Sequence, residues 1–276
     1  MAQIINTNIM SLNSQRYLNR SQDSLSNSLK RLSSGLRVNS AMDDAAGLAV
    51  AQKMESQIRG MTVAARNASD GISCAQIADT AMDTVAQQLQ RMRELATQAL
   101  NTTLSGSERE KIDVEFSQLQ LEASRIQTSA KFNGMELFRP TSGDLLSKGR
   151  EFTFQVGAGA TDQITAAFSG INISGQTVSG SGTGGAASAL ETIDLWLDSI
   201  ATQRANIGGV QSRLNFTISY LEGAIENQSA AKSRIMDADF AAETASLTRA
   251  QILQQAGTAM VSQANSVPQN VLSLLR

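Results

Sequence analysis

The chain has 276 residues, of which 41% are hydrophobic, only 4% are aromatic and 17% are charged, with a formal net charge of −2. So few aromatic side chains argue against a large globular core, because aromatics usually fill wide interiors. The small net charge gives no reason to expect a nucleic-acid partner. The chain has no histidine and one cysteine. It therefore lacks the commonest general base and metal ligand and any internal disulfide. We expect no enzyme, no cofactor and no metal site.

The sequence has no segment typical of membrane insertion or general secretion. Residues 1–6 lack the basic start and the apolar run of a signal peptide. No stretch approaches the ~20 apolar residues that a spanning helix needs. We expect neither a membrane-spanning helix nor a cleaved signal.

Apolar residues at helical spacing begin the chain. Within residues 1–37 they are Ile5, Ile9, Leu12, Leu25, Leu29, Leu32 and Leu36. This spacing predicts an amphipathic helix with a narrow apolar seam. Gly35 and the pair Asn39-Ser40 predict its end.

A second helix is predicted over residues 41–100. Asp43 and Asp44 place acids at its first turn, where the helix dipole stabilises negative charge. We therefore interpret the pair as helix-capping residues and not as metal ligands. Its apolar seam consists of Ile72, Ala75, Ala78, Met82, Val85, Leu89, Met92 and Ala96.

A third helix follows a turn at residues 101–106. Ser107-x-x-Glu110 matches a capping box. The connection is short, so this helix should fold back antiparallel on its predecessor.

Residues 131–187 have a different pattern. Residues 151–156 alternate between apolar and polar side chains, and 163–168 do so more weakly, which predicts a β-hairpin. The glycine- and serine-rich run 180–185 is typical of a flexible connector. Gly180-x-Gly182-x-x-Gly185 also matches a dinucleotide-binding fingerprint, but no parallel strands surround it, so we interpret it as a chance match.

The longest stripe runs from Leu190 to Ile235 with a period of 3.5 residues, the pattern of a coiled coil. A helix of this length extends roughly 69 Å and cannot bury its own seam. Two polar residues interrupt the stripe, Arg204 and Gln211. They either set the register of the coil or extend their polar ends to solvent at its edge.

A final helix is predicted after residues 236–240. Asp237 and Asp239 suit its start, and Pro268 should bend it. Its predicted seam is Leu253, Ala256, Met260, Ala264, Val267, Val271 and Leu274.

Together these elements predict a mainly α fold. Both chain ends build a long antiparallel helical coiled coil or bundle, with a small β-hairpin insertion in the middle. We expect residues 1–40 and 237–276 to form a terminal coiled-coil domain, and 41–138 with 188–236 an outer helical bundle domain that includes the insertion 139–187. The terminal helices have too little apolar surface to offset the entropy of ordering, so they imply partners from other molecules.

Both ends of the chain resemble bacterial flagellin, the subunit of the flagellar filament. The resemblance rests on blocks that follow one another in family order at residues 1–8, 31–39, 43–49, 66–73, 90–98, 132–134, 233–240, 249–257 and 264–276. It identifies a short flagellin without large outer domains.

This resemblance implies a structural subunit that polymerises with itself into the filament used for swimming motility. Flagellins are exported unfolded through the type III apparatus of the flagellum and become extracellular. Their partners are an export chaperone that binds the carboxy-terminal helix, cap and hook-associated proteins, and in some hosts a Toll-like receptor. The terminal helices would be disordered in the monomer and become ordered in the filament core.

The resemblance also assigns residues to surfaces. The filament-core packing residues would be Ile5, Ile9, Leu25, Leu29, Leu32, Leu36, Leu253, Met260, Val267, Val271 and Leu274. A subunit-contact surface, read by the receptor mainly through Arg91, Leu95 and Glu115, would comprise Leu89, Gln90, Arg91, Arg93, Glu94, Leu95, Gln98 and Glu115. Candidate O-glycosylation sites are Thr141, Ser142, Thr177, Ser179 and Ser181.

Two other functions stay open at this point. A hook–filament junction protein shares the terminal design, although the last ten residues favour flagellin. A soluble coiled-coil adaptor has the same periodicity but would form small closed oligomers.

Overall fold

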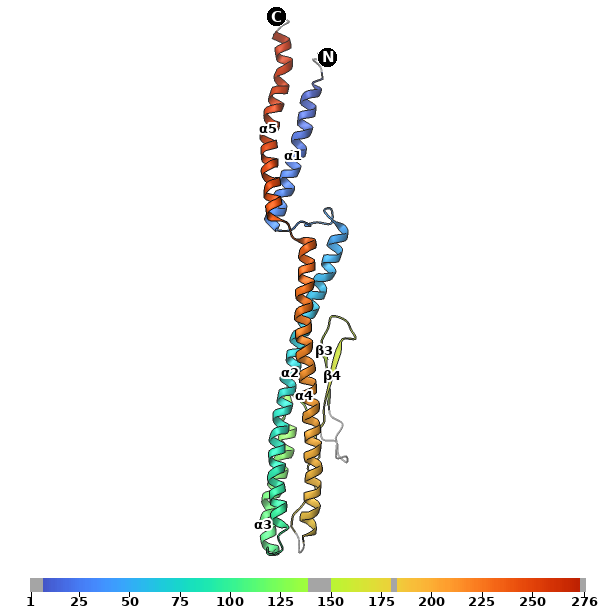
Figure 1. Cartoon of the computed structure of the whole chain (residues 1–276), viewed down its shortest axis with the longest axis vertical. Coiled ribbons are helices and arrows are strands. Elements are labelled where there is room, and N and C mark those ends of the chain that lie inside the picture. The colour runs from blue at the N-terminus through green and yellow to red at the C-terminus, as the bar shows by residue number, and fades with distance from the viewer. Residues whose placement is uncertain (1–6, 139–149, 180–182, 274–276) are drawn as a thin grey trace. The chain divides into compact units, whose positions relative to one another are not determined.

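The computed structural model describes residues 7–138, 150–179 and 183–273, with side chains as far as Ser266. Its helices and strands are shown in Figure 1. In chain order they are α1 (Ile9–Ser34), α2 (Ala45–Ala99), α3 (Gly106–Ser129), β1 (Lys131–Phe132), β2 (Met135–Glu136), β3 (Arg150–Gln155), β4 (Gln163–Phe168), α4 (Gly184–Met236) and α5 (Phe240–Ser273). The mainly α fold with a β-hairpin in the middle is thus confirmed. Helix α5 continues through Pro268 to Ser273, and the predicted bend at Pro268 stays a prediction.

The chain divides into two compact units. The terminal unit is Met1–Ile58 with Glu226–Arg276, and the central unit is Arg59–Ile225. The predicted domain boundaries at 40/41 and 236/237 fall between helices, whereas the two units divide inside α2 and α4. The predicted boundaries therefore stay a prediction.

In the terminal unit, α1 and α5 pack antiparallel. The Asn8 side chain accepts a hydrogen bond from the Ser11 N–H at 3.1 Å and caps the start of α1. Gly35 ends this helix in the left-handed conformation, with φ of +71°, and its N–H donates to the Arg31 carbonyl at 2.8 Å. The predicted end of the first helix is therefore confirmed, because glycine adopts a positive φ without steric cost.

The two connectors of the terminal unit pair with each other. The Arg37 N–H donates to the Met236 carbonyl at 2.6 Å, and the Ala238 N–H donates to the Gly35 carbonyl at 2.9 Å. These bonds satisfy backbone groups where two helices end.

Acidic side chains cap the helices that follow the connectors. Asp44 accepts from the Gly47 N–H at 2.8 Å at the start of α2, and Asp239 accepts from the Ala241 N–H at 2.9 Å at the start of α5. Capping, as expected, satisfies otherwise unpaired amides of the first turn.

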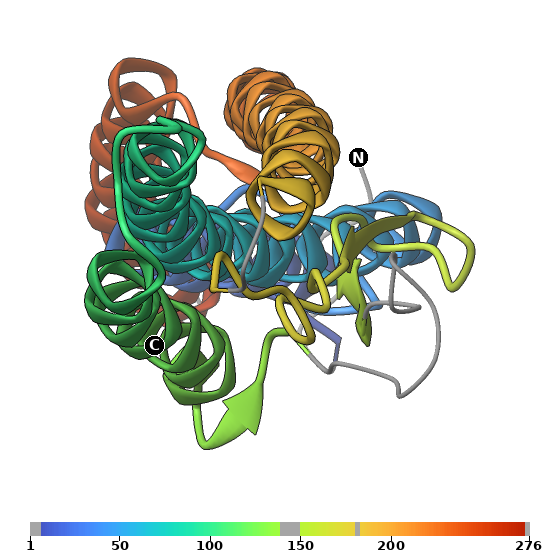
Figure 2. The same ribbon diagram turned by 90° about the horizontal axis from the view of Figure 1, so that it is seen from below.

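The core of the central unit lies among α2, α3 and α4, which Figure 2 shows from below. The predicted seam of α2 is buried from Ala75 to Ala96, with each of its members fully covered. Phe116 of α3 and Trp196 of α4 are among the largest side chains of the same core. The predicted stripe of α4 likewise buries Ile193, Ile200 and Ile207.

Arg204 connects α4 to α2. Its Nε lies 2.9 Å from Asp79 Oδ1, and its Nη1 lies 2.7 Å from Asp83 Oδ1. A guanidinium can satisfy two carboxylates one turn apart because its donors form a rigid fork. Arg204 is therefore a candidate register device between the two helices.

The predicted capping box of α3 was wrong by two residues. Ser105 is the cap, and its N–H and Oγ donate to Glu108 Oε2 at 2.7 and 2.8 Å. Both Ser105 and Ser107 fit the sequence pattern. The helix begins at Gly106, because the connecting turn is shorter than the sequence suggested.

The predicted hairpin is confirmed as β3 and β4, which pair antiparallel with Phe154 opposite Ile164. Phe152 and Phe168 are buried on one face, with ring centroids 5.7 Å apart. Gly71 of α2 lets the hairpin approach, since a Cβ there would stand 3.2 Å from Phe154 Cγ.

Candidate subunit-contact surface

Small side chains recur along the face between α1 and α5. On both helices most of the buried and half-buried positions follow one another at steps of three and four. Those that do are Ser11, Ser14, Leu18, Ser21, Leu25 and Ser28 on α1, and Glu243, Leu247, Ala250, Gln254, Gly257, Val261 and Ala264 on α5. Serine, alanine and glycine let two helix backbones approach closely, and the steps are those of a coiled coil. We call this face the small-residue seam.

Polar contacts fix the register of the small-residue seam. The Ser21 hydroxyl donates to the Ala250 carbonyl at 3.1 Å, and the Asn8 amide donates to the Ala264 carbonyl at 2.8 Å. Arg31 and Glu243 approach to 3.7 Å at the other end. Hydrogen bonds to carbonyls of the partner helix hold a serine that would otherwise be buried without a partner.

Large apolar side chains of the terminal unit point outward. Ile9 is 66% exposed, Leu29 is 49% exposed, and Leu253 and Met260 are 54% and 59% exposed. The sequence predicted these residues as packing residues, and within one subunit they do not pack. Their positions explain this: Leu18, Leu25 and Leu247 occupy positions of the small-residue seam and are half-buried, whereas Ile9, Leu29, Leu253 and Met260 fall between its steps.

The remaining predicted packing residues divide into two groups. Leu25, Leu32 and Leu36 are half-buried. Ile5 and Leu274 lie outside the described residues, as do the side chains of Val267 and Val271, whose backbones belong to α5.

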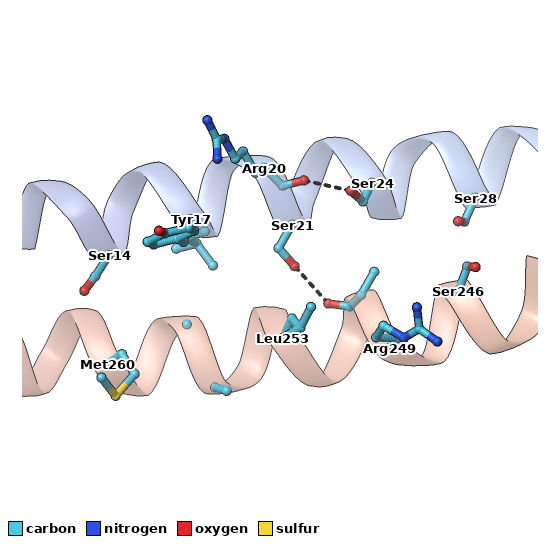
Figure 3. Close-up of a pocket in the computed structure, with 14 residues that line it drawn as sticks. Ser14, Tyr17, Arg20, Ser21, Ser24, Ser28, Ser246, Arg249, Leu253 and Met260 are labelled. Carbon is cyan, nitrogen blue, oxygen red and sulfur yellow. Dashed lines mark hydrogen bonds between the residues drawn. The ribbon is translucent and has the colours of Figure 1, made fainter. Parts of the chain in front are cut away.

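An apolar groove of about 610 Å³ lies along one side of α1 and α5 (Figure 3). Its large apolar and aromatic lining residues are Tyr17, Leu18, Leu253 and Met260. Arg20 and Arg249 add positive charge to the lining. The groove thus offers apolar surface suited to another helix.

The predicted receptor surface is a charged face of the central unit. Arg91 Nη2 lies 2.9 Å from Glu115 Oε1, and Arg91 Nη1 lies 2.9 Å from Glu94 Oε2. Hydrogen bonds to Glu94 and Glu115 raise the pKa of the Arg91 guanidinium above its ordinary value. The structure therefore brings Arg91 and Glu115 together from α2 and α3, as an ion pair.

Other members of this predicted surface differ in exposure. Gln90, Glu94 and Gln98 are exposed and line a shallow hollow with Arg93, whose Nε lies 2.7 Å from Asp194 Oδ1. Leu89 and Leu95 are 0% and 2% exposed and belong to the hydrophobic core. In the folded subunit these two leucines lie beneath the charged face, and their predicted contact with a partner stays a prediction.

The predicted glycosylation sites are only partly described. Thr177 is exposed and Ser179 is half-buried, whereas Thr141, Ser142 and Ser181 lie outside the described residues.

We next consider metal ligands, the cysteine thiol and membrane-spanning segments in the described residues. Within the ranges given above, no group of three or more candidate ligand side chains is placed to hold a metal ion. Cys74 is buried, and burial raises the pKa of its thiol to about 11. Such a thiol is a weak nucleophile at neutral pH, because the thiolate is the reactive form. None of the helices in the described part of the chain is long and apolar enough to cross a membrane.

Two family models match the chain. The bacterial flagellin N-terminal helical region matches residues 5–142, and the bacterial flagellin C-terminal helical region matches residues 190–275. The chain belongs to the bacterial flagellin family. The resemblance found in the sequence is thereby confirmed.

This flagellin is similar to relatives of nearly the same length. It is 40% identical to flagellin FlaB1 of Treponema pallidum over 286 residues, and 40% identical to a flagellin of Halalkalibacterium halodurans over 278 residues. It is also 40% identical, over 288 residues, to the flagellar filament 33 kDa core protein of Treponema phagedenis. Each alignment covers 99% of this chain and 100% of the relative. These relatives therefore share the short middle segment of this flagellin.

The small-residue seam was not predicted from the sequence. Ser14, Ser21 and Ser28 recur every seven residues, as do Ala250, Gly257 and Ala264. A heptad repeat of small residues was the signal that could have located it.

Proposed function

We propose that this chain is a structural subunit that polymerises with itself into the bacterial flagellar filament used for swimming. The proposal rests on which side chains of the terminal unit are buried between its helices and which are exposed. Small residues pair α1 with α5 inside one subunit, while large apolar residues such as Leu253 and Met260 remain exposed. Membership of the flagellin family and the similarity to a filament core protein support the same reading.

Exposed apolar residues on paired helices favour association with further copies. Burying a fully exposed leucine or methionine contributes about 1.5–3 kcal/mol, and Leu253 and Met260, at 54% and 59% exposed, would gain about half of this. A neighbour that covers Leu253 and Met260 of one copy exposes its own equivalents elsewhere, and such contacts build an open polymer. The filament-core packing residues predicted from the sequence thus become contacts between subunits.

Export and location follow from this function. The subunit would leave the cell through the flagellar type III apparatus without a cleaved signal peptide and reside in the extracellular filament. The export chaperone would bind α5 before assembly, and cap and hook-associated proteins would contact the ends of the filament.

The charged face of Arg91 and Glu115 has two proposed roles. In the filament it would contact a neighbouring subunit, and in a suitable host it would bind a Toll-like receptor. Both residues are exposed and joined at 2.9 Å, so a receptor would meet a preformed pair of charges. A receptor reporter assay would test this with Glu115→Ala beside Glu151→Ala, an exposed acidic control on β3. Equal signalling by both variants and the unaltered chain would remove the receptor role.

Glycosylation of the insertion is a separate proposal. Among the described candidates Thr177 is accessible to a transferase because it is exposed. The intact mass of the chain purified from its own cells would test this, and a mass equal to that of the unmodified sequence would reject it.

Electron microscopy of purified protein after seeded assembly tests the main proposal. The full chain should form long filaments, and a chain lacking residues 241–276 should remain monomeric. Leu253→Ser together with Met260→Ser should raise the critical concentration at least about tenfold, since apolar contact area is lost. Gln255→Ser, a change at an exposed polar position of α5, is the matched control.

Other outcomes distinguish the alternatives. Small closed oligomers from both the full and the truncated chain would favour a soluble coiled-coil adaptor. Short stacks that form only on the end of a hook or filament would favour a hook–filament junction protein.

A further inference from the structure

Two exposed apolar pairs stand on different helices of the central unit. Phe216 and Tyr220 lie one turn apart on α4 and are 76% and 71% exposed. Val114 and Leu121 lie two turns apart on α3 and are 63% and 64% exposed. We call these pairs the α4 patch and the α3 patch. Exposed apolar patches with polar surroundings are typical of interaction sites.

The two patches lie at different heights along the central unit. Leu214, two residues before Phe216, lies beside Gly71, where an added Cβ would stand 3.1 Å from its Cδ1. Glu115, next to Val114, forms an ion pair with Arg91. Positions 71 and 91 are both on α2 and are 20 residues apart, which corresponds to about 30 Å of helix.

We propose that the α4 patch of one copy binds the α3 patch of a second copy that is displaced by about 30 Å along the helices. The inference rests on the proposed filament function and names two surfaces that meet in it. Two different patches make a heterologous contact. Displacement along the helices prevents this contact from closing into a flat ring, so it propagates as a helical polymer.

Charge complementarity supports a second copy as the occupant. Within one copy, α3 runs antiparallel to α2 because Arg91 pairs with Glu115 across a short turn. Helix α4 also runs antiparallel to α2, because Arg93 pairs with Asp194 and Asp79 pairs with Arg204 further along α4. Helices α3 and α4 are therefore parallel, and they stay parallel between copies that point the same way along a polymer.

In this parallel arrangement the charges meet in the same order as the patches. Exposed Glu110 lies four residues before Val114, and exposed Arg213 lies three residues before Phe216. When Val114 faces Phe216, Glu110 faces Arg213. Opposite charges beside an apolar contact fix its register and oppose wrong pairings.

Cross-linking tests which surfaces meet. A chain with Cys74→Ala, Val114→Cys and Phe216→Cys would be assembled and then treated with a short flexible bis-maleimide. It should give a ladder of dimers, trimers and higher species on a denaturing gel, because each copy joins two neighbours. Val114→Cys or Phe216→Cys alone should give no cross-linked species above background.

A matched pair of cysteines controls for chance proximity. Ser129→Cys on α3 and Ala205→Cys on α4 are also exposed positions of the same two helices. They should give no ladder. A ladder from this pair equal to that from 114 and 216 would overturn the proposal, and so would dimers from Phe216→Cys alone, which would indicate a symmetric contact.

Charge reversal gives an independent readout. Arg213→Glu and Glu110→Arg, each alone, should raise the critical concentration about fivefold or more, because like charges then meet at the contact. The double variant should return it to within about twofold of the unaltered chain. Unchanged thermal unfolding of the monomers would show that folding is preserved.

The outcomes separate this inference from the proposed function. Filaments from the unaltered chain without a 114–216 ladder and without rescue by the double reversal would overturn the contact and leave the filament subunit standing. No filaments from the unaltered chain under seeded conditions would overturn both.

Discussion

Leu18 of α1 lies directly over Gly257 of α5. A Cβ built on Gly257 would stand 3.1 Å from Leu18 Cδ1 and 3.7 Å from Leu18 Cβ. The leucine therefore fills the space that the glycine leaves open. The contact therefore marks a close approach of α1 and α5 within the small-residue seam.

Substitution of Gly257 should separate the two helices. Gly257→Val adds a branched side chain against Leu18, and we expect the terminal unit to lose about 1–3 kcal/mol through overpacking. Gly208→Ala on α4 is the control, because nothing lies within 4 Å of its added Cβ, and it should stabilise by about 0.5–1 kcal/mol. Thermal unfolding of the chain and thermal dissociation of filaments measure both effects. A Gly257→Val chain as stable as the unaltered one would mean that the seam is looser than described.

Arg204 should stabilise the central unit modestly. Its side chain and those of Asp79 and Asp83 are 38%, 39% and 45% exposed, so solvent screens the pairs. Arg204→Met should cost about 0.5–1 kcal/mol in denaturant unfolding. The loss should shrink at 1 M salt, where screening is strong. A loss that does not change with salt would indicate packing of the arginine stem as its cause.

Cys74 should respond to alkaline pH. Burial raises the pKa of its thiol from 9.0 to about 11, so the folded state disfavours the thiolate. The resulting stabilisation is fully present below pH 9 and is lost as the pH rises toward 11. Between pH 8 and 11 the unaltered chain should therefore lose more stability than Cys74→Ala. The native thiol should also react with maleimide at pH 7 far more slowly than the thiol of the chain in denaturant. Parallel pH profiles of the two chains would contradict the assignment.

Glu108 should contribute stability in the opposite pH range. The Ser105 N–H and hydroxyl donate to its carboxylate and hold the pKa of Glu108 below its ordinary value. Its stabilisation is therefore present above the unfolded pKa of about 4.5 and is lost as the pH falls through the lower, folded value.

The experiment compares Glu108→Ala with Glu110→Ala at pH 7 and at pH 2.5. Glu108→Ala should lower the thermal midpoint at pH 7 and have little effect at pH 2.5. Glu110→Ala should show a smaller pH-dependent difference. The reverse order of the two variants would restore the capping box predicted from the sequence.

Much of the fold was predictable from the sequence because it is local. Helices with a clear apolar period, the end at Gly35 and the alternation around Phe152 depend on neighbouring residues, and each was found within a few residues. The exact cap of α3 was missed because Ser105 and Ser107 both fit the pattern. Only the length of the turn decides between them.

The sequence by itself determined which segments are helical, that both chain ends carry thin apolar stripes, and that the chain is a flagellin. Only the tertiary structure decided which face of each terminal helix turns inward. Periodicity predicted leucine and methionine as packing residues, within one subunit or between subunits, because burying them yields the most free energy. In the folded unit serine, alanine and glycine share that place with a few larger residues such as Leu18 and Leu247, because the seam follows positions offset from those of Leu253 and Met260. Leu253 and Met260 are left on the outside, where only another molecule can cover them.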